Sequence, residues 1–206
     1  MNNQASILHP DYLDITGTDG GVFHGADQAW FPGRWQRISG CGPTAAAMVT
    51  AYLARTRDGC APLYPEGEMR QEAFAAHMSR VWQHVTPGHM GLHRPEKFSD
   101  GLAGYAARCG VTLHPHLFEV SGAGSSRPDW FACAEFVRGA LARDCPVAFL
   151  NLSNGAEASL ESWHWVVITA LDGGQAAILD GGRARLIDLA LWYQTTPKRG
   201  GLVAAV

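Results

Sequence analysis

Apolar residues in the first two thirds of the chain recur at helical spacing. The segment 42–56 has Pro43 in its first turn, where the missing N–H of proline costs nothing. Its apolar side chains then lie three or four positions apart, at Met48, Val49, Tyr52 and Leu53. The pattern predicts a helix that ends at a Gly- and Pro-bearing loop, and the same spacing predicts helices over 68–84, 95–108 and 129–143.

The last third of the chain has short apolar runs rich in β-forming residues. These runs cover 146–150, 165–168 and 176–179, and Asp172-Gly173-Gly174 between the last two is typical of a hairpin turn. The first forty residues, rich in Gly, Asp and aromatics, predict irregular structure. A helical first part followed by a mostly antiparallel sheet indicates an α+β fold.

Composition limits the function classes. The chain has 206 residues, 47% hydrophobic and 17% charged, which suits a single domain over 1–206. A net charge of -3, with scattered Lys and Arg, excludes nucleic acid and anionic lipid as expected partners. No apolar run reaches the ~18 to 20 residues of a membrane span, and the N-terminus lacks the features of a signal peptide. We therefore expect a cytoplasmic protein, and the sequence leaves its oligomeric state open.

One of the five cysteines lies in an unusual context. The cysteines are odd in number and have no Cys-x-x-Cys spacing, which favours reduced thiols over disulfides or a zinc site. Cys41 stands in Ser39-Gly40-Cys41-Gly42-Pro43-Thr44, directly before an alanine-rich run. Unpaired N–H groups and the helix dipole stabilise a thiolate at such a position, and the flanking glycines leave the sulfur open to approach. The alternative is a small buried hydrophobic residue. For the other four thiols a structural role is expected; they are Cys60, Cys109, Cys133 and Cys145.

A nucleophile needs a base and a group that orients the base. His164 stands apart from the other eight histidines because it opens the apolar run at 165–168, and Asp180 ends the next run. Taken alone, Asp180 is more typical of a turn residue before two glycines. Most remaining histidines come in loose pairs without the ordered spacing of metal ligands, so we expect solvated histidines, no metal and no cofactor; the pairs are His77 and His84, His89 and His93, and His114 and His116.

These motifs together resemble the papain-like cysteine peptidases. The Gly-Cys-Gly-Pro-Thr motif, the His-Trp-Val-Val run and the Asp that ends the next run are similar to the branch of bacteriocin-processing, double-glycine-leader peptidases and their stand-alone relatives. The segment 136–147 resembles the helix and strand before the histidine in those proteins. The similarity spans roughly 28–193, and 58–128 matches only weakly. The resemblance implies a papain-like fold in which a nucleophile at a helix N-terminus packs on the sheet.

The resemblance also implies a role for each motif residue. Cys41 would be the nucleophile, His164 the general base and then acid, and Asp180 the group that holds the imidazole. A glutamine upstream of the cysteine would complete the oxyanion hole, and Gln28 is preferred to Gln36. Gly40 and the tryptophans on either side of His164, Trp163 and Trp165, are candidates for substrate binding, although alternating tryptophans on a strand more often fill a core.

The implied activity is hydrolysis of a peptide or amide through an acyl-enzyme. Two alternatives remain open: a transferase in which an amine replaces water, and a noncatalytic peptide-binding relative.

The three roles require His164 and Asp180 to share one face of the sheet. A two-residue turn at Gly173-Gly174 would place Asp180 opposite Val167, on the other face. A three-residue turn or a β-bulge would place Asp180 opposite Val166 and diagonal to His164, at a backbone separation of roughly 7 to 8 Å. We therefore predict a turn of odd length or a bulge.

Overall fold

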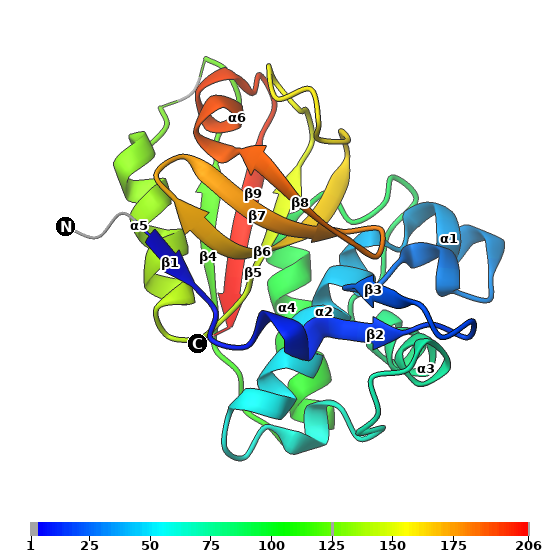
Figure 1. The fold of residues 1–206 in the computed structure, drawn as a ribbon. Helices are drawn as coiled ribbons and strands as arrows, with labels where there is room; N and C mark the ends of the chain where they lie inside the picture. Colours follow the sequence, from blue (N-terminus) through cyan, green and yellow to red (C-terminus); the bar gives the residue numbers. More distant parts are fainter. Residues whose placement is uncertain (1–3, 125, 206) are drawn as a thin grey trace.

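The computed structural model describes residues 4–124 and 126–205, which form a mixed α+β fold with a mostly antiparallel sheet (Figure 1). The α-helices are α1 (Arg34–Ser39), α2 (Cys41–Thr56), α3 (Gln71–Trp82), α4 (Pro95–Arg108), α5 (Trp130–Leu141) and α6 (Leu189–Thr195). Short 3-10 helices are η1 (Pro10–Leu13), η2 (Gln28–Trp30) and η3 (Ala61–Leu63). The strands are β1 (Gln4–Ser6), β2 (Asp14–Thr16), β3 (Val22–His24), β4 (Pro115–Val120), β5 (Val147–Asn151), β6 (His164–Asp172), β7 (Gln175–Asp180), β8 (Arg183–Asp188) and β9 (Gly200–Ala205).

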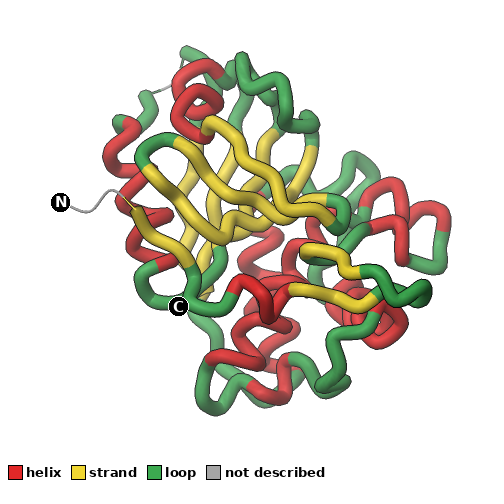
Figure 2. The backbone as a smooth tube through the Cα atoms, in the orientation of Figure 1, coloured by secondary structure: helices red, strands yellow, loops and turns green. Residues whose placement is uncertain are grey.

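The main sheet has the order β4-β9-β5-β6-β7-β8, and each of its strand pairs is antiparallel. β1 pairs with the end of β6, and β2 and β3 form a separate two-stranded ribbon. Figure 2 shows the strands of the main sheet together, with most helices gathered around α2 to one side. The sheet joins segments from both ends of the chain.

Helices cover both faces of the sheet. Trp165 of β6 stacks on Phe98 of α4, with ring centroids 4.3 Å apart. Phe149 of β5 lies opposite Val166, so it points to the other face, and there its ring meets Trp192 of α6 at 4.5 Å. The strands between these layers are therefore buried on both sides, which explains why their sequences are continuous apolar runs.

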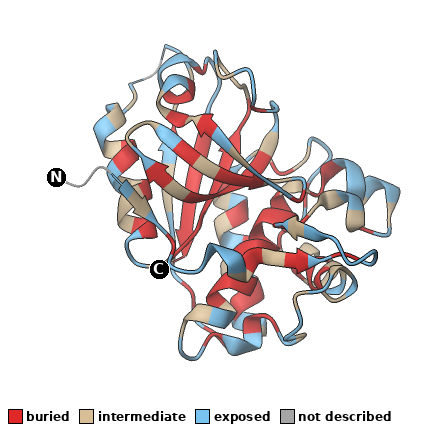
Figure 3. Ribbon diagram, viewed as in Figure 1, coloured by how far each residue is buried: buried red, intermediate tan, exposed pale blue. Residues whose placement is uncertain are grey.

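Helix α2 lies in the middle of the helical region. Every residue from Gly42 to Leu53 is buried, and Figure 3 shows this helix and the central strands as the buried interior. A helix surrounded by protein has no polar face, and small alanine side chains let its neighbours approach closely. The alanine-rich run after Cys41 is thus explained by packing, and it fixes the start of α2 relative to β6.

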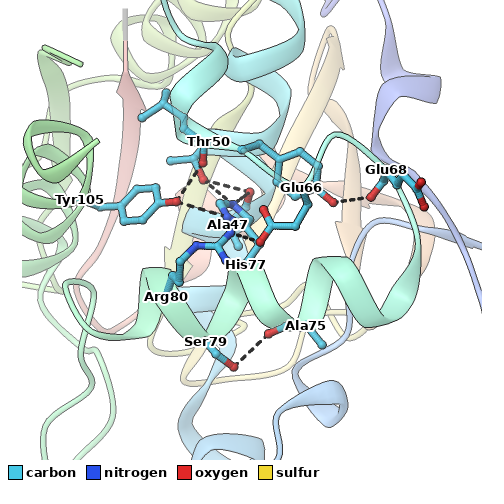
Figure 4. A network of polar contacts seen from close by, with 11 residues as sticks. Ala47, Thr50, Glu66, Glu68, Ala75, His77, Ser79, Arg80 and Tyr105 are labelled. Carbon is cyan, nitrogen blue, oxygen red and sulfur yellow. Dashed lines mark hydrogen bonds and ion pairs between the residues drawn. The ribbon is translucent and has the colours of Figure 1, made fainter. Parts of the chain in front are cut away.

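A buried histidine ties α3 to α2, contrary to the expectation of a solvated side chain. His77 is completely buried, and its Nε2 lies 3.2 Å from the carbonyl oxygen of Ala47 and 3.0 Å from Oγ1 of Thr50 (Figure 4). A carbonyl only accepts, so Nε2 carries the ring proton. Burial, assisted by the charge of Arg80, lowers the pKa of His77 to about 3. His77 is therefore a neutral structural residue.

The hairpin between β6 and β7 contains the predicted bulge, not the predicted three-residue turn. Asp172 pairs with Gln175, which makes the turn two residues long, with Gly173 at a φ of +58° that suits glycine. The register then shifts between Ile168 and Ala170, so that Thr169 is the extra residue of a bulge. Beyond the bulge Val167 pairs with Leu179, which brings Asp180 onto the same face as His164.

The predicted helices are confirmed, with changed ends for three of them. The prediction over 95–108 matches α4, 42–56 becomes Cys41–Thr56, and 68–84 and 129–143 shorten to α3 and α5. The prediction of irregular structure for the first forty residues is wrong, because this segment holds β1 to β3 and α1. β1 pairs with the distant strand β6, a pairing that local sequence does not reveal, and the three-residue strands β2 and β3 pair with each other.

Candidate active site

Cys41 is the first residue of α2. Helix α1 ends at Ser39, and Gly40 joins the two helices. The first N–H groups of a helix have no partner within it, and the dipole adds positive potential at the same end. Cys41 is partly exposed, so its sulfur combines this environment with access to solvent.

His164 and Asp180 form a hydrogen bond across neighbouring strands. Nε2 of His164 lies 2.7 Å from Oδ1 of Asp180, and both side chains are largely buried, with exposed fractions of 15% and 10%. Burial alone would raise the pKa of Asp180, but the hydrogen bond with His164 and the positive charges of His164 and Arg185 hold it below its ordinary value. The contact predicted between these two side chains is confirmed.

Cys41 is the second partner of the imidazole. Burial opposes protonation of His164, yet hydrogen bonds with Asp180 and with Cys41, together with the Coulombic effect of both groups, raise the pKa of His164 to about 10. Because Asp180 occupies Nε2, the ring has Nδ1 left for the Cys41 sulfur. The structure thus brings Cys41, His164 and Asp180 into one cluster.

Cys41 lies between two cavities. The first, the polar cavity, has a volume of about 260 Å³; it is lined by polar side chains, among them Gln28, Glu161, His164 and Asp180, and also by apolar Met48, Trp165 and Leu179. The second, of about 300 Å³, is lined mainly by apolar side chains: Trp35, Ile38, Met90, Leu92, Leu150 and Trp163. Four of these, Trp35, Ile38, Met90 and Trp163, are also exposed to solvent. The sulfur therefore has a polar surface on one side and an apolar one on the other.

The two candidate glutamines occupy different environments. Gln28 lines the polar cavity beside Cys41, and its Nε2 donates a hydrogen bond of 2.8 Å to the carbonyl of Arg37. Gln36 instead caps α1, because its Oε1 accepts a hydrogen bond of 3.1 Å from the backbone N–H of Gly33. Gln28 therefore lies beside Cys41 while Gln36 bonds within its own helix, and the oxyanion role of Gln28 stays a prediction.

The glycines beside Cys41 serve internal packing, and this corrects the sequence argument. Gly40 is buried, and a Cβ on it would lie 2.3 Å from the carbonyl oxygen of Gln36 and 2.6 Å from the ring of Phe31. A Cβ on Gly42 would lie 2.6 Å from Leu92. The absent side chains make room for the protein's own residues, and substrate binding at Gly40 stays a prediction.

The two tryptophans beside His164 also differ. Trp165 is a core residue: it is buried, stacks on Phe98 and donates its indole N–H to the carbonyl of Leu92. Trp163 is exposed, lines the apolar cavity and has a φ of +59°. A left-handed conformation is strained for a bulky residue and costs of order 1–3 kcal/mol. Of the pair, Trp163 remains the candidate for substrate binding, whereas Trp165 reaches the polar cavity from the core.

Three of the other thiols are buried, as expected of a structural role. Burial raises the pKa of Cys133 to about 12 and that of Cys145 to about 11. Cys60 is also buried, whereas Cys109, which follows the last residue of α4, is partly exposed. Cys41 is the cysteine that contacts an imidazole among the described residues.

Two residues beside the cluster were missed by sequence reasoning. Arg185 of β8 forms an ion pair with Oδ2 of Asp180. Asn151 of β5 lies directly opposite His164; it is fully buried, and neither polar atom of its side chain has a hydrogen-bond partner in the described ranges. β8 begins after Gly181-Gly182, a turn signal that predicts a hairpin and thereby places Arg185 diagonal to Asp180. No comparable signal identifies Asn151.

Within residues 4–124 and 126–205, no three His, Cys, Asp or Glu side chains are grouped so as to hold a metal ion. Over the same residues no helix combines the length and apolar character needed to cross a membrane.

Comparison with known proteins finds a remote similarity to a solved structure. No known protein family and no curated protein matches the chain. Among solved structures, the chain is similar to the crystal structure of the Pseudomonas avirulence protein AvrPphB, with 12% sequence identity and a TM-score of 0.36 over 79% of this chain and 90% of that one. A similarity this remote carries no argument about activity, so function has to be argued from the side chains themselves.

Proposed function

We propose that the chain is a papain-like cysteine peptidase or amidase with Cys41 as its nucleophile. The observation that carries the proposal is the His164–Asp180 hydrogen bond, which leaves the second ring nitrogen for a cysteine at a helix N-terminus. This combination supplies a thiol nucleophile, an imidazole beside it that can take up and return a proton, and a carboxylate that fixes the orientation of the imidazole.

The proposed reaction is an acyl transfer in two halves. The Cys41 thiolate attacks the carbonyl carbon, the imidazolium of His164 gives its proton to the leaving nitrogen, and the C–N bond breaks to leave a thioester. Water then attacks the thioester while His164 takes up one of its protons, and the thiolate is released. The raised pKa of His164 keeps the proton available for the first half at neutral pH.

Gln28 is proposed to stabilise the oxyanion together with backbone N–H groups at the start of α2. The amide nitrogen of Gln28 has two hydrogens, and its bond to the carbonyl of Arg37 uses one of them. The second is free to donate to an oxygen held above Cys41. Loss of one such donor costs about 10²–10³ in kcat in enzymes of this kind of chemistry.

The two cavities beside Cys41 suggest how a substrate lies. A peptide that places its carbonyl carbon at the sulfur can put an apolar side chain into the cavity of Trp35, Ile38 and Trp163. The part of the substrate on the other side of the scissile bond then meets the polar cavity of Glu161 and His164. All five cysteines are free thiols, and a reducing cytoplasm is the proposed setting for a thiol enzyme.

Labelling with a peptidyl electrophile tests the proposal. We expect a peptidyl chloromethyl ketone with an apolar side chain to modify Cys41 alone, as mapped by mass spectrometry of the digested protein. Cys41→Ala should abolish labelling and turnover, while Cys109→Ala, which removes another partly exposed thiol, should change neither. Labelling of several cysteines at similar slow rates would overturn the proposal. Product analysis with an added amine separates hydrolysis from transfer, and a labelled protein without turnover of any peptide would favour a binding role.

A further inference from the structure

A row of polar side chains crosses three neighbouring strands at the His164 end of the sheet. Asp180 of β7 lies diagonal to His164 of β6, and Arg185 of β8 lies diagonal to Asp180 on its other side. Diagonal neighbours of this kind are within reach of long side chains. The sheet register therefore sets His164, Asp180 and Arg185 in sequence on one face.

The two carboxylate oxygens of Asp180 contact different neighbours. Oδ1 bonds to Nε2 of His164 at 2.7 Å, and Oδ2 pairs with a terminal nitrogen of Arg185. The other terminal nitrogen of Arg185 lies 3.3 Å from the carbonyl oxygen of Ser159, in the loop that leads to Trp163 and His164. The planar guanidinium thus connects Asp180 to the segment on which the imidazole is mounted.

We propose that Arg185 is a positioning residue of the active site, which fixes the rotation of the Asp180 carboxylate and thereby the orientation of His164. This inference rests on the proposed function of the Cys41 site. A carboxylate with one anchored oxygen keeps the other directed at the imidazole, whereas an unanchored carboxylate rotates freely and is more easily protonated. Arg185 acts through Asp180 and does not itself touch the sulfur.

Several charged groups face Asp180, and a test has to separate them. Besides His164 and Arg185, Arg183 lies directly opposite Asp180 on β8, and Asp27 and Glu161 line the same cavity as Cys41. Arg183 is exposed, and no ion pair joins it to Asp180 within the described ranges. Arg183→Met therefore removes a nearby positive charge without removing an anchor, and it is the matched control for Arg185→Met.

The readout is the rate at which iodoacetamide alkylates Cys41 as a function of pH, because it needs no known substrate. In Arg185→Met the Asp180 carboxylate should take up a proton at a higher pH than in the wild type. A protonated Asp180 no longer stabilises the imidazolium of His164, and the imidazolium in turn stabilises the thiolate of Cys41 less. We expect the acid limb of the rate profile to move up by about one pH unit, a roughly tenfold slower reaction on that limb. Arg185→Lys keeps the positive charge, so its profile should be shifted by only part of this amount. Arg183→Met should leave the profile near that of the wild type.

A double-mutant cycle makes the test specific. If Arg185 acts through Asp180, then Arg185→Met should have little further effect in an Asp180→Asn background. Should Arg185→Met fail to fold, the partial shift expected of Arg185→Lys decides the question. An unchanged profile in Arg185→Met, or in Arg185→Lys where Arg185→Met does not fold, would refute the positioning role alone, provided that Cys41 is reactive in the wild type. A wild-type Cys41 that reacts no faster than Cys109 would refute the proposed function itself.

Discussion

Replacing Gly40 by alanine tests whether this residue serves packing or substrate binding. The added Cβ would lie 2.3 Å from the backbone carbonyl oxygen of Gln36 and has to retreat by about 0.7 Å to reach the 3.0 Å limit of real contacts. The same carbon would meet the ring of Phe31 at 2.6 Å. Overpacking of this kind costs about 1–3 kcal/mol. We expect the free energy of unfolding to fall by about 2 kcal/mol, which lowers Tm by about 4–8 °C in a chain of this size.

The matched control is Gly104→Ala on the solvent side of α4. A Cβ there has His84 as its nearest neighbour, at 3.7 Å, so alanine fits and its helix propensity should add about 1 kcal/mol of stability. Chemical denaturation followed by circular dichroism measures both variants. Because the strained junction also carries Cys41, alkylation of Cys41 should slow in Gly40→Ala. A Gly40→Ala protein as stable as the wild type, with a changed KM for a peptide, would refute the packing argument and restore the substrate-binding role.

Two further predictions concern pH. In Asp180→Asn the imidazole loses the carboxylate that helps to raise the pKa of His164 to about 10, so the alkaline limb of turnover should move down by about 1–3 pH units; a limb that stays in place would show that Asp180 does not act on His164. His77 has a pKa lowered to about 3 by burial, so between pH ~6.5 and 3 the unfolded chain binds a proton that the folded chain does not. The free energy of unfolding should therefore fall on acidification, by up to ~1.4 kcal/mol per pH unit from this group. Urea denaturation at pH 7 and pH 4.5 should show a smaller loss of this free energy in His77→Gln than in the wild type. Equal losses in the two proteins would remove His77 as the cause.

The helices could be predicted from the sequence because their apolar spacing is local information. The spacing over 95–108 defines α4 to the residue, and the pattern after Cys41 defines α2. The strands β8 and β9 were not predicted, since their sequences mix glycine, arginine and alanine, and they become strands only by pairing with β7, β4 and β5. Pairing over such distances along the chain leaves no periodic signal in a short segment.

The candidate site was predictable where a residue has a distinctive position in its own element. Cys41 begins a helix and His164 begins a strand, and both positions can be recognised in the sequence. Arg185 was not assigned, because its contact with Asp180 depends on a strand that was not predicted, although the turn signal Gly181-Gly182 precedes that strand. The glycines beside Cys41 were identified for the wrong reason, since Phe31, Gln36 and Leu92 approach them only in the folded chain.

The bulge at Thr169 shows why the register of the site could not be derived from the sequence alone. Strand β6 is buried on both faces from Trp165 to Thr169, so it lacks the alternation of apolar and polar residues that normally fixes a register. The two-residue turn by itself would send Asp180 to the face opposite His164. The extra residue Thr169 reverses the face on which Asp180 lies. Its carbonyl accepts a 3.0 Å hydrogen bond from the backbone N–H of Ile7, just beyond β1. The N-terminal segment thus holds the bulge from the side opposite β7, and through the bulge it sets the face on which His164 and Asp180 meet.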